Sequence, residues 1–160
     1  MSLVDGALSA TCDYCKATYL PEKNEDGIRV FDLTSSYACP VCQVALLHAS
    51  MARQRMLYCR QCHGSLISMP AFVVILDTLR TQVGGGVAIA PPPDPHQLDR
   101  VLNCPECHRR MDTHYYAGGG NVIIDDCSRC EWNWLDAGEL MAIVHAPDSY
   151  RESRFRMDES

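Results

Sequence analysis

The 160-residue chain has no cysteine outside a Cys-x-x-Cys pair, no long apolar run and no excess of basic residues. Its longest apolar run, residues 71–76, is far shorter than the roughly 20 residues that a bilayer-spanning helix needs. The opening residues, MSLVDGALSA, contain neither a basic cluster nor a long apolar stretch, so we expect no signal peptide and no membrane attachment. Paired thiols without a secretory signal favour reduced, metal-binding cysteines over disulfides, and we expect a cytoplasmic protein.

The sequence also lacks the motifs of several enzyme classes. It contains no His-Glu-x-x-His, no Gly-x-Ser-x-Gly and no Gly-x-x-x-x-Gly-Lys. The zinc deaminase pattern, in which His-x-Glu precedes Pro-Cys-x-x-Cys, is missing as well. We therefore predict that the chain is not an enzyme.

The shortage of positive charge bears on the class of partner. The formal net charge is −6, and each zinc ion held by four thiolates would add two further negative charges. An acidic protein is repelled by phosphate backbones. Residues 39–83 carry four arginines against one aspartate, whereas residues 104–146 carry seven acids against three arginines. Any nucleic-acid contact is therefore expected in the first Cys-rich unit, through His48, Arg53, Arg55 and Arg60.

What the chain does have is ten cysteines in five Cys-x-x-Cys pairs. Two residues between thiols allow a tight turn to direct both sulfurs at one ion, and two such turns make the tetrahedral thiolate site typical of structural zinc. Sixteen residues separate the second pair from the third, and nineteen separate the fourth from the fifth; both gaps are typical of zinc modules. The sequence therefore predicts two Zn²⁺ sites, although a rubredoxin-like iron site would use the same ligands. Site 1 comprises Cys39, Cys42, Cys59 and Cys62, and site 2 comprises Cys104, Cys107, Cys127 and Cys130.

The first pair, Cys12 and Cys15, supplies only two ligands where a closed site needs four. A histidine could complete a third site, or two chains could share one ion and form a homodimer. The first pair could instead join Cys39 and Cys42, if residues 18–20 and 28–33 form a hairpin, or it could remain as free thiols. We expect metal binding by Cys12 and Cys15 and leave the remaining ligands open. The histidines considered are His48, His63, His108 and His114.

A Gly/Pro-rich segment, residues 84–103, divides two similar halves and predicts a linker. Each half reads as Cys-x-x-Cys knuckle, β-hairpin, second knuckle and helix. The hairpin of the first half is expected at 44–47 and 56–58, and that of the second at 115–117 and 122–124 around a glycine turn at 118–121. Ser68 caps the first helix, and Asp136 to Glu139 has the form of a capping box for the second.

The predicted fold is a small metal-stabilised α+β protein made of two zinc ribbons. Its organisation is an N-terminal segment (1–36), ribbon 1 (37–83), the linker (84–103), ribbon 2 (104–146) and a charged tail (147–160).

Residues 104–140 resemble the zinc ribbon of transcription factor IIB and the transcription-factor zinc-finger family. They carry Cys-Pro-x-Cys, a second Cys-x-x-Cys and then Trp134-Leu-Asp-Ala-Gly-Glu-Leu140. Residues 39–72 match this pattern more weakly, because Leu66-Ile-Ser replaces Trp-Leu-Asp. The resemblance implies a zinc-stabilised ribbon without catalytic residues of its own, and in transcription factor IIB the ribbon contacts RNA polymerase.

These observations predict a zinc-binding, non-enzymatic interaction module that binds a protein and is associated with transcription. Trp132 is the candidate interface anchor, whereas Trp134 is expected in the core. The alternatives are nucleic-acid binding, for which Arg53 and Arg55 are candidate contacts, and rubredoxin-like or thiol redox chemistry.

Overall fold

The structure is a computed structural model that describes residues 2–3, 9–83, 94–116 and 122–145. Parts of four predicted features lie outside these ranges: the N-terminal segment, residues 84–93 of the linker, the glycine turn at 118–121 and the charged tail.

One antiparallel sheet of seven strands runs through both ribbons, in the order β4-β5-β6-β7-β10-β9-β8. The hairpins predicted from β-branched and aromatic runs are present in both halves. Their bounds differ from the prediction by up to four residues, and the first strand of the second hairpin shares only Tyr115 with the predicted 115–117. Their chain reversals leave β4 and β8 as the two edges of the sheet. The strands are β4 (Arg29–Ala38), β5 (Ala45–Met51), β6 (Gln54–Tyr58), β7 (Ser65–Ser68), β8 (Asp112–Tyr115), β9 (Ile123–Cys127) and β10 (Trp132–Leu135).

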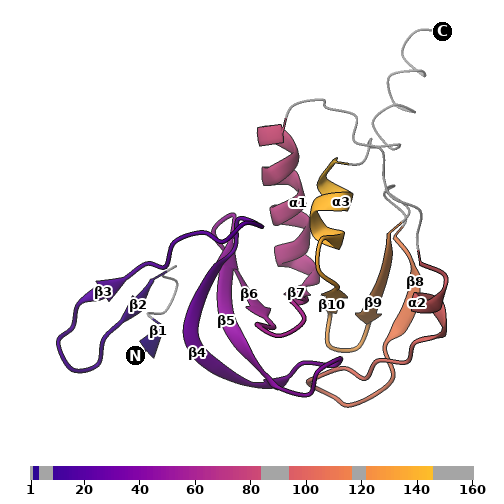
Figure 1. The fold of residues 1–160 in the computed structure, drawn as a ribbon, viewed down its shortest axis with the longest axis horizontal. Coiled ribbons are helices and arrows are strands. Elements are labelled where there is room, and N and C mark those ends of the chain that lie inside the picture. The colour runs from indigo at the N-terminus through magenta and orange to yellow at the C-terminus, as the bar shows by residue number, and fades with distance from the viewer. Residues whose placement is uncertain (1, 4–8, 84–93, 117–121, 146–160) are drawn as a thin grey trace, which may run out of the picture.

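Two helices, α1 (Met69–Val83) and α3 (Glu139–His145), follow β7 and β10 and lie side by side (Figure 1). Ser68 caps α1 as predicted, because its Oγ accepts a hydrogen bond from the backbone N–H of Ala71 at 3.3 Å. Half of the predicted capping box forms at α3: the Glu139 carboxylate accepts the Asp136 backbone N–H at 2.7 Å, while the Asp136 carboxylate bonds elsewhere. A short helix, α2 (His96–Asp99), lies within the segment predicted as linker. Within the described residues, no helix is long and apolar enough to cross a bilayer.

The two ribbons meet through β7 and β10, which pair antiparallel in register from Ser65–Leu135 to Ser68–Trp132. Leu66 lies opposite Trp134, and these two residues also occupy corresponding positions of the internal repeat. The ribbons are therefore related by an approximate two-fold axis between Leu66 and Trp134. The sequence predicts two ribbons joined by a linker, and the shared sheet is an additional connection that the sequence pattern does not reveal.

The core has two parts. One buries the apolar residues of α1 and α3 against the sheet, with Ile75 and Ile143 fully buried. The other holds eight metal-site cysteines together with Leu46, Leu66 and Trp134. Trp134 has no exposed surface, as predicted for a core residue. The molecule is thus mostly β, with few helices, and both metal sites share one apolar cluster.

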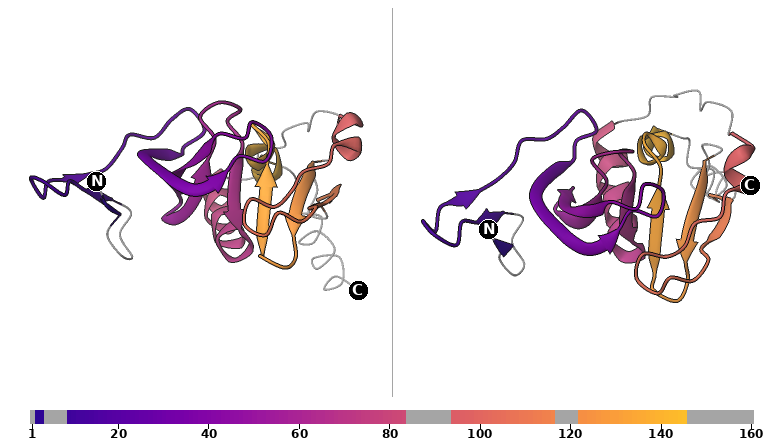
Figure 2. Two further views of the ribbon diagram at one scale, coloured as in Figure 1. Left: turned by 90° about the horizontal axis from the view of Figure 1, so that it is seen from below. Right: turned by 60° about the horizontal axis from the view of Figure 1, so that its bottom comes forward.

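A second, small sheet contains β1 (Ser2–Leu3), β2 (Ala10–Thr11) and β3 (Thr18–Tyr19) and projects away from the main body (Figures 1 and 2). Here one of the alternatives from the sequence is wrong. Residues 18–19 pair with 10–11, and β4 pairs with β5, so no hairpin brings Cys12 and Cys15 to Cys39 and Cys42.

Candidate metal centres

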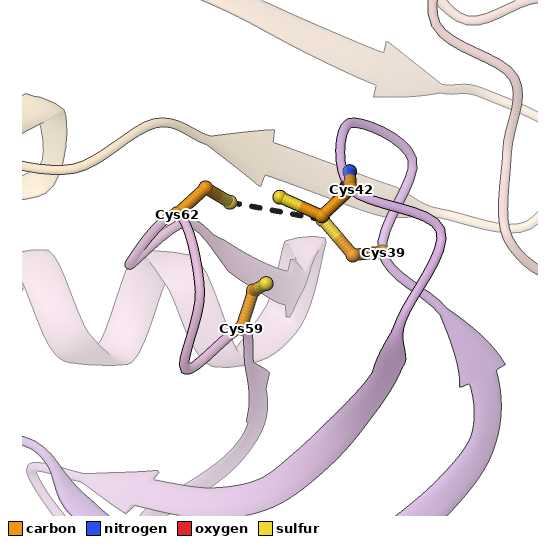
Figure 3. Close-up of side chains that lie close together, drawn as sticks. All are labelled: Cys39, Cys42, Cys59 and Cys62. Atoms are coloured by element: carbon orange, nitrogen blue, oxygen red, sulfur yellow. Dashed lines mark hydrogen bonds between the residues drawn. The ribbon is translucent and has the colours of Figure 1, made fainter.

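Site 1 lies where two turns of the first ribbon meet. Cys39 and Cys42 lie in the turn from β4 to β5, and Cys59 and Cys62 in the turn from β6 to β7 (Figure 3). All four Sγ atoms lie within 4.8 Å of one another, and 3.7 Å separates those of Cys39 and Cys62. The first cysteine of each pair is buried and the second is half-buried.

Site 2 repeats this arrangement in the second ribbon. Cys104 and Cys107 precede β8, Cys127 is the last residue of β9, and Cys130 lies in the turn from β9 to β10. Their four Sγ atoms again lie within 4.8 Å of one another, with 3.7 Å between Cys107 and Cys127. The structure thus brings together the two sets of four cysteines that the spacing predicted.

The sulfur geometry fits zinc. A Zn–S bond of roughly 2.3 Å in a tetrahedron places neighbouring sulfurs about 3.8 Å apart, close to the distance found in both sites. Four thiolates would fill the coordination sphere of one zinc ion at each site, which is the arrangement of closed structural zinc sites.

The knuckles owe their shape to a repeated backbone conformation. In each knuckle, the residue that follows the second cysteine donates its N–H to the carbonyl of the first and adopts a positive φ. Non-glycine residues rarely adopt this conformation, so its recurrence shows that the turn is required. In the two ribbons these residues are Gln43, His63, His108 and Glu131, with φ between 59° and 63°.

The thiols differ in acidity. Burial raises the pKa of Cys39 to about 11, and it also raises the pKa of Cys62 and of Cys130. By contrast, a hydrogen bond from the backbone N–H of Arg109 lowers the pKa of Cys107 to about 7. Zinc must therefore displace protons from buried thiols, so metal affinity falls as the pH falls.

The structure places the predicted interaction residues in separate regions. Trp132 is half-buried: its indole packs edge-on against Tyr37, at 6.1 Å between ring centroids, and its N–H donates to Glu106. Arg53 lies in the β5–β6 turn and Arg55 follows in β6.

Arg60 and Arg80 are held by other parts of the chain. Arg60 lies in the knuckle at the far end of β6 and pairs with Asp32 at 2.6 Å. Arg80 donates to the carbonyl of Ile143. Arg53 and Arg60 therefore flank opposite ends of β6.

A polar network that the sequence analysis missed ties residues 94–103 to ribbon 2. The Arg100 guanidinium contacts Asp136 at 2.7 Å and Asp125 at 3.1 Å. Asp125 is only 1% exposed, and this burial raises the pKa of its carboxyl group despite a hydrogen bond from Thr113. The only signal in the sequence is the acidic pair Asp125-Asp126 directly after a predicted strand. Nothing in the sequence connects this pair to Arg100, which follows the proline-rich part of the linker.

The histidines considered for a third site are engaged elsewhere or lie within the main sheet and its knuckles. His63 bonds the Tyr58 hydroxyl at 2.6 Å, and His114 pairs with Asp126. His48 lies in β5 and His108 in a knuckle. Among the described residues, the groups of His, Cys, Asp and Glu that could hold an ion are sites 1 and 2, and Cys12 and Cys15 belong to neither.

Comparison with known proteins supports the zinc-ribbon assignment of the second half. Residues 103–146 match the transcription factor zinc-finger family, the TFIIB-type zinc ribbon. The first four-cysteine site, residues 39–62, lies outside that match and is a ribbon on structural grounds. No curated protein and no solved structure matches the chain. The chain therefore contains a zinc-binding ribbon of TFIIB type and a second four-cysteine site built in the same way.

Proposed function

We propose that this chain is a non-enzymatic interaction module whose two zinc ions hold a rigid sheet against a protein partner. The observation that carries this proposal is the closure of both metal sites, in one apolar cluster, by four cysteines each. Metal in such sites supports a surface and leaves no ligand position for chemistry. Cysteines without a disulfide suit a reducing compartment such as the cytoplasm, and we propose that the protein works there.

The first knuckle (residues 39–42) presents exposed apolar side chains that a protein partner could bury. Val41 at its tip is 41% exposed, and Val44 just after it is also exposed. Tyr37 precedes this knuckle and packs on Trp132 of the second ribbon. A protein partner would bury these apolar groups, and the fixed knuckle would cost little ordering entropy on binding. The family match makes the transcription apparatus the first class of partner to test.

Nucleic acid is the weaker candidate. Arg60 lies at the opposite end of β6 from Arg53 and Arg55 and already pairs with Asp32. The net charge of −6 further disfavours contact with a phosphate backbone.

The test is quantitative recovery of partners by the tagged full chain in two matched variants. Val41→Asp places a charge on the first knuckle, whereas Val73→Asp places the same charge at an exposed site of α1. We expect Val41→Asp to lose the partner at least tenfold and Val73→Asp to keep it, with zinc content unchanged in both. Equal recovery by all three proteins would refute the surface. DNA or RNA binding with a steep salt dependence would favour the alternative, and red iron-loaded protein would favour a redox role.

A further inference from the structure

Cys12 and Cys15 lie in the turn between β2 and β3, on the small sheet that projects from the body (Figure 2). This turn has the backbone of the four ribbon knuckles. The Cys12 N–H donates to the carbonyl of Ala17 at 2.9 Å, and the Lys16 N–H donates to the carbonyl of Cys12 at 2.9 Å. Cys39 makes the same pair of bonds, with Val44 and Gln43. The φ angle of Lys16 is 60°, within the 59–63° range of the ribbon knuckles.

The backbone hydrogen bonds of this turn and the positive φ of Lys16 thus match those of a knuckle of site 1. The turn is a preformed half of a four-thiolate site.

Little else in the small sheet accounts for this conformation. Its strands are two residues long, and within residues 9–20 only Ala10 is buried. Three such short strands without a buried apolar face are too few for independent stability. A non-glycine residue with a positive φ, such as Lys16, is strained and persists when its surroundings fix it. A bound ion would fix it.

We propose that Cys12 and Cys15 form half of a third zinc site, which the same two cysteines of a second copy of this chain complete. In the described part of the chain, no other His, Cys, Asp or Glu groups with this pair. Sites 1 and 2 each consist of two similar knuckles that face each other. A two-fold axis between two chains would bring two identical knuckles together in the same way.

Charge and exposure suit this pairing. Four thiolates around one Zn²⁺ carry a net charge of −2, and the two Lys16 ammonium groups, one per chain, balance it. Tyr14 is 99% exposed, and Tyr19 and Leu20 are exposed beside it, so the small sheet offers apolar surface for the contact. On binding, each thiol gives its proton to solvent and its sulfur to the ion, with no change of redox state.

Zinc content and mass together test the proposal in the full chain under reducing conditions. We expect 2.5 zinc ions per chain and twice the 17.8 kDa chain mass, measured by elemental analysis and light scattering. Removal of loosely held zinc should return the chain to the monomer mass. Half an equivalent of added Zn²⁺ per chain should then restore the dimer mass. In Cys12→Ser/Cys15→Ser we expect two ions and a monomer, whereas the control Thr18→Ser on β3 should behave as wild type.

Three results would overturn the proposal. Three ions in a monomer would mean that one chain supplies all ligands of the third site. Two ions in a monomer, with zinc in excess, would mean that the pair does not bind zinc or needs a different protein. A dimer that persists in Cys12→Ser/Cys15→Ser would mean that zinc is not the clasp. None of these readouts requires the protein partner of the proposed function, so the two proposals can fail independently.

Discussion

Replacing Gly64 with alanine tests the junction between the two ribbons. Gly64 follows the second knuckle of site 1, and its carbonyl accepts the Cys59 N–H at 2.9 Å. A Cβ atom added there would lie 2.3 Å from Cζ2 and 2.7 Å from Cη2 of Trp134. The tryptophan cannot withdraw easily, because it is fully buried and its N–H donates to Asp136. The substitution therefore forces the knuckle or the β7–β10 pairing to shift.

Overpacking of this kind costs roughly 1–3 kcal/mol, and a clash with an aromatic ring belongs at the upper end. We expect Gly64→Ala to lower the free energy of unfolding of the zinc-loaded protein by about 3 kcal/mol in urea titrations. Gly138→Ala is the matched control. Its φ of +82° brings strain, but its Cβ would meet nothing within 4 Å, so about 1 kcal/mol is expected.

A double mutant separates the clash from other effects of the alanine. Trp134→Leu introduces leucine, which the first ribbon has at the corresponding position, Leu66. It also removes the ring atoms nearest Gly64. In that background Gly64→Ala should cost less than 1 kcal/mol. If alanine costs the same in both backgrounds, or no more than at Gly138, the close packing described for this junction is wrong.

Two further predictions concern the polar network of ribbon 2. Burial raises the pKa of Glu139 to about 7 from an ordinary value near 4.5. The contribution of the Glu139 carboxyl to the free energy of unfolding is therefore fully present below pH 4.5 and is lost as the pH rises through 7. Between pH 6 and 8 the wild type should therefore lose about 1.4 kcal/mol of unfolding free energy relative to Glu139→Gln. Arg100→Met leaves the buried Asp125 carboxylate without its cation and should cost about 3 kcal/mol at pH 8, measured by urea unfolding. Arg60→Met, which breaks an exposed pair, should cost less than 1 kcal/mol, and equal costs for the two arginines would contradict the burial of the Arg100 pair.

Local chemistry is what made the two metal sites predictable. Cys-x-x-Cys spacing fixes which sulfurs can share an ion, and gaps of sixteen and nineteen residues fit one hairpin each. The Ser68 cap and the carboxylate of Glu139 also follow from local sequence, because a capping side chain reaches only three residues along the chain. The structure brings these features together where the sequence placed them.

Contacts between distant segments were not predictable in the same way. β7 is four residues long and directly precedes a helix, so its sequence carries no alternation that would reveal its pairing with β10. Arg100 reaches Asp125 only once the chain after the prolines has folded back on ribbon 2. The register between β7 and β10 places the Trp134 ring against Gly64. These residues are seventy positions apart in the sequence, so their contact is visible only in the folded structure.

The shared sheet predicts that the two zinc sites are energetically coupled, although 41 residues separate their cysteines in sequence. Two ribbons on a flexible linker would bind zinc independently. Here both sites line one apolar cluster, and β7 and β10, which follow their second knuckles, are hydrogen-bonded to each other. Loss of the ion at site 1 through Cys59→Ser should therefore loosen β7 and weaken site 2.

We expect zinc at site 2 to bind at least tenfold more weakly in Cys59→Ser than in wild type, or about 1.4 kcal/mol, in competition with a colorimetric chelator. Binding equilibria are reciprocal, so Cys127→Ser must weaken site 1 by the same factor. Unequal factors would show that a substitution damages the fold beyond its own site. Unchanged affinity in both variants would show that the ribbons act independently, and the single-sheet description would then be wrong in solution.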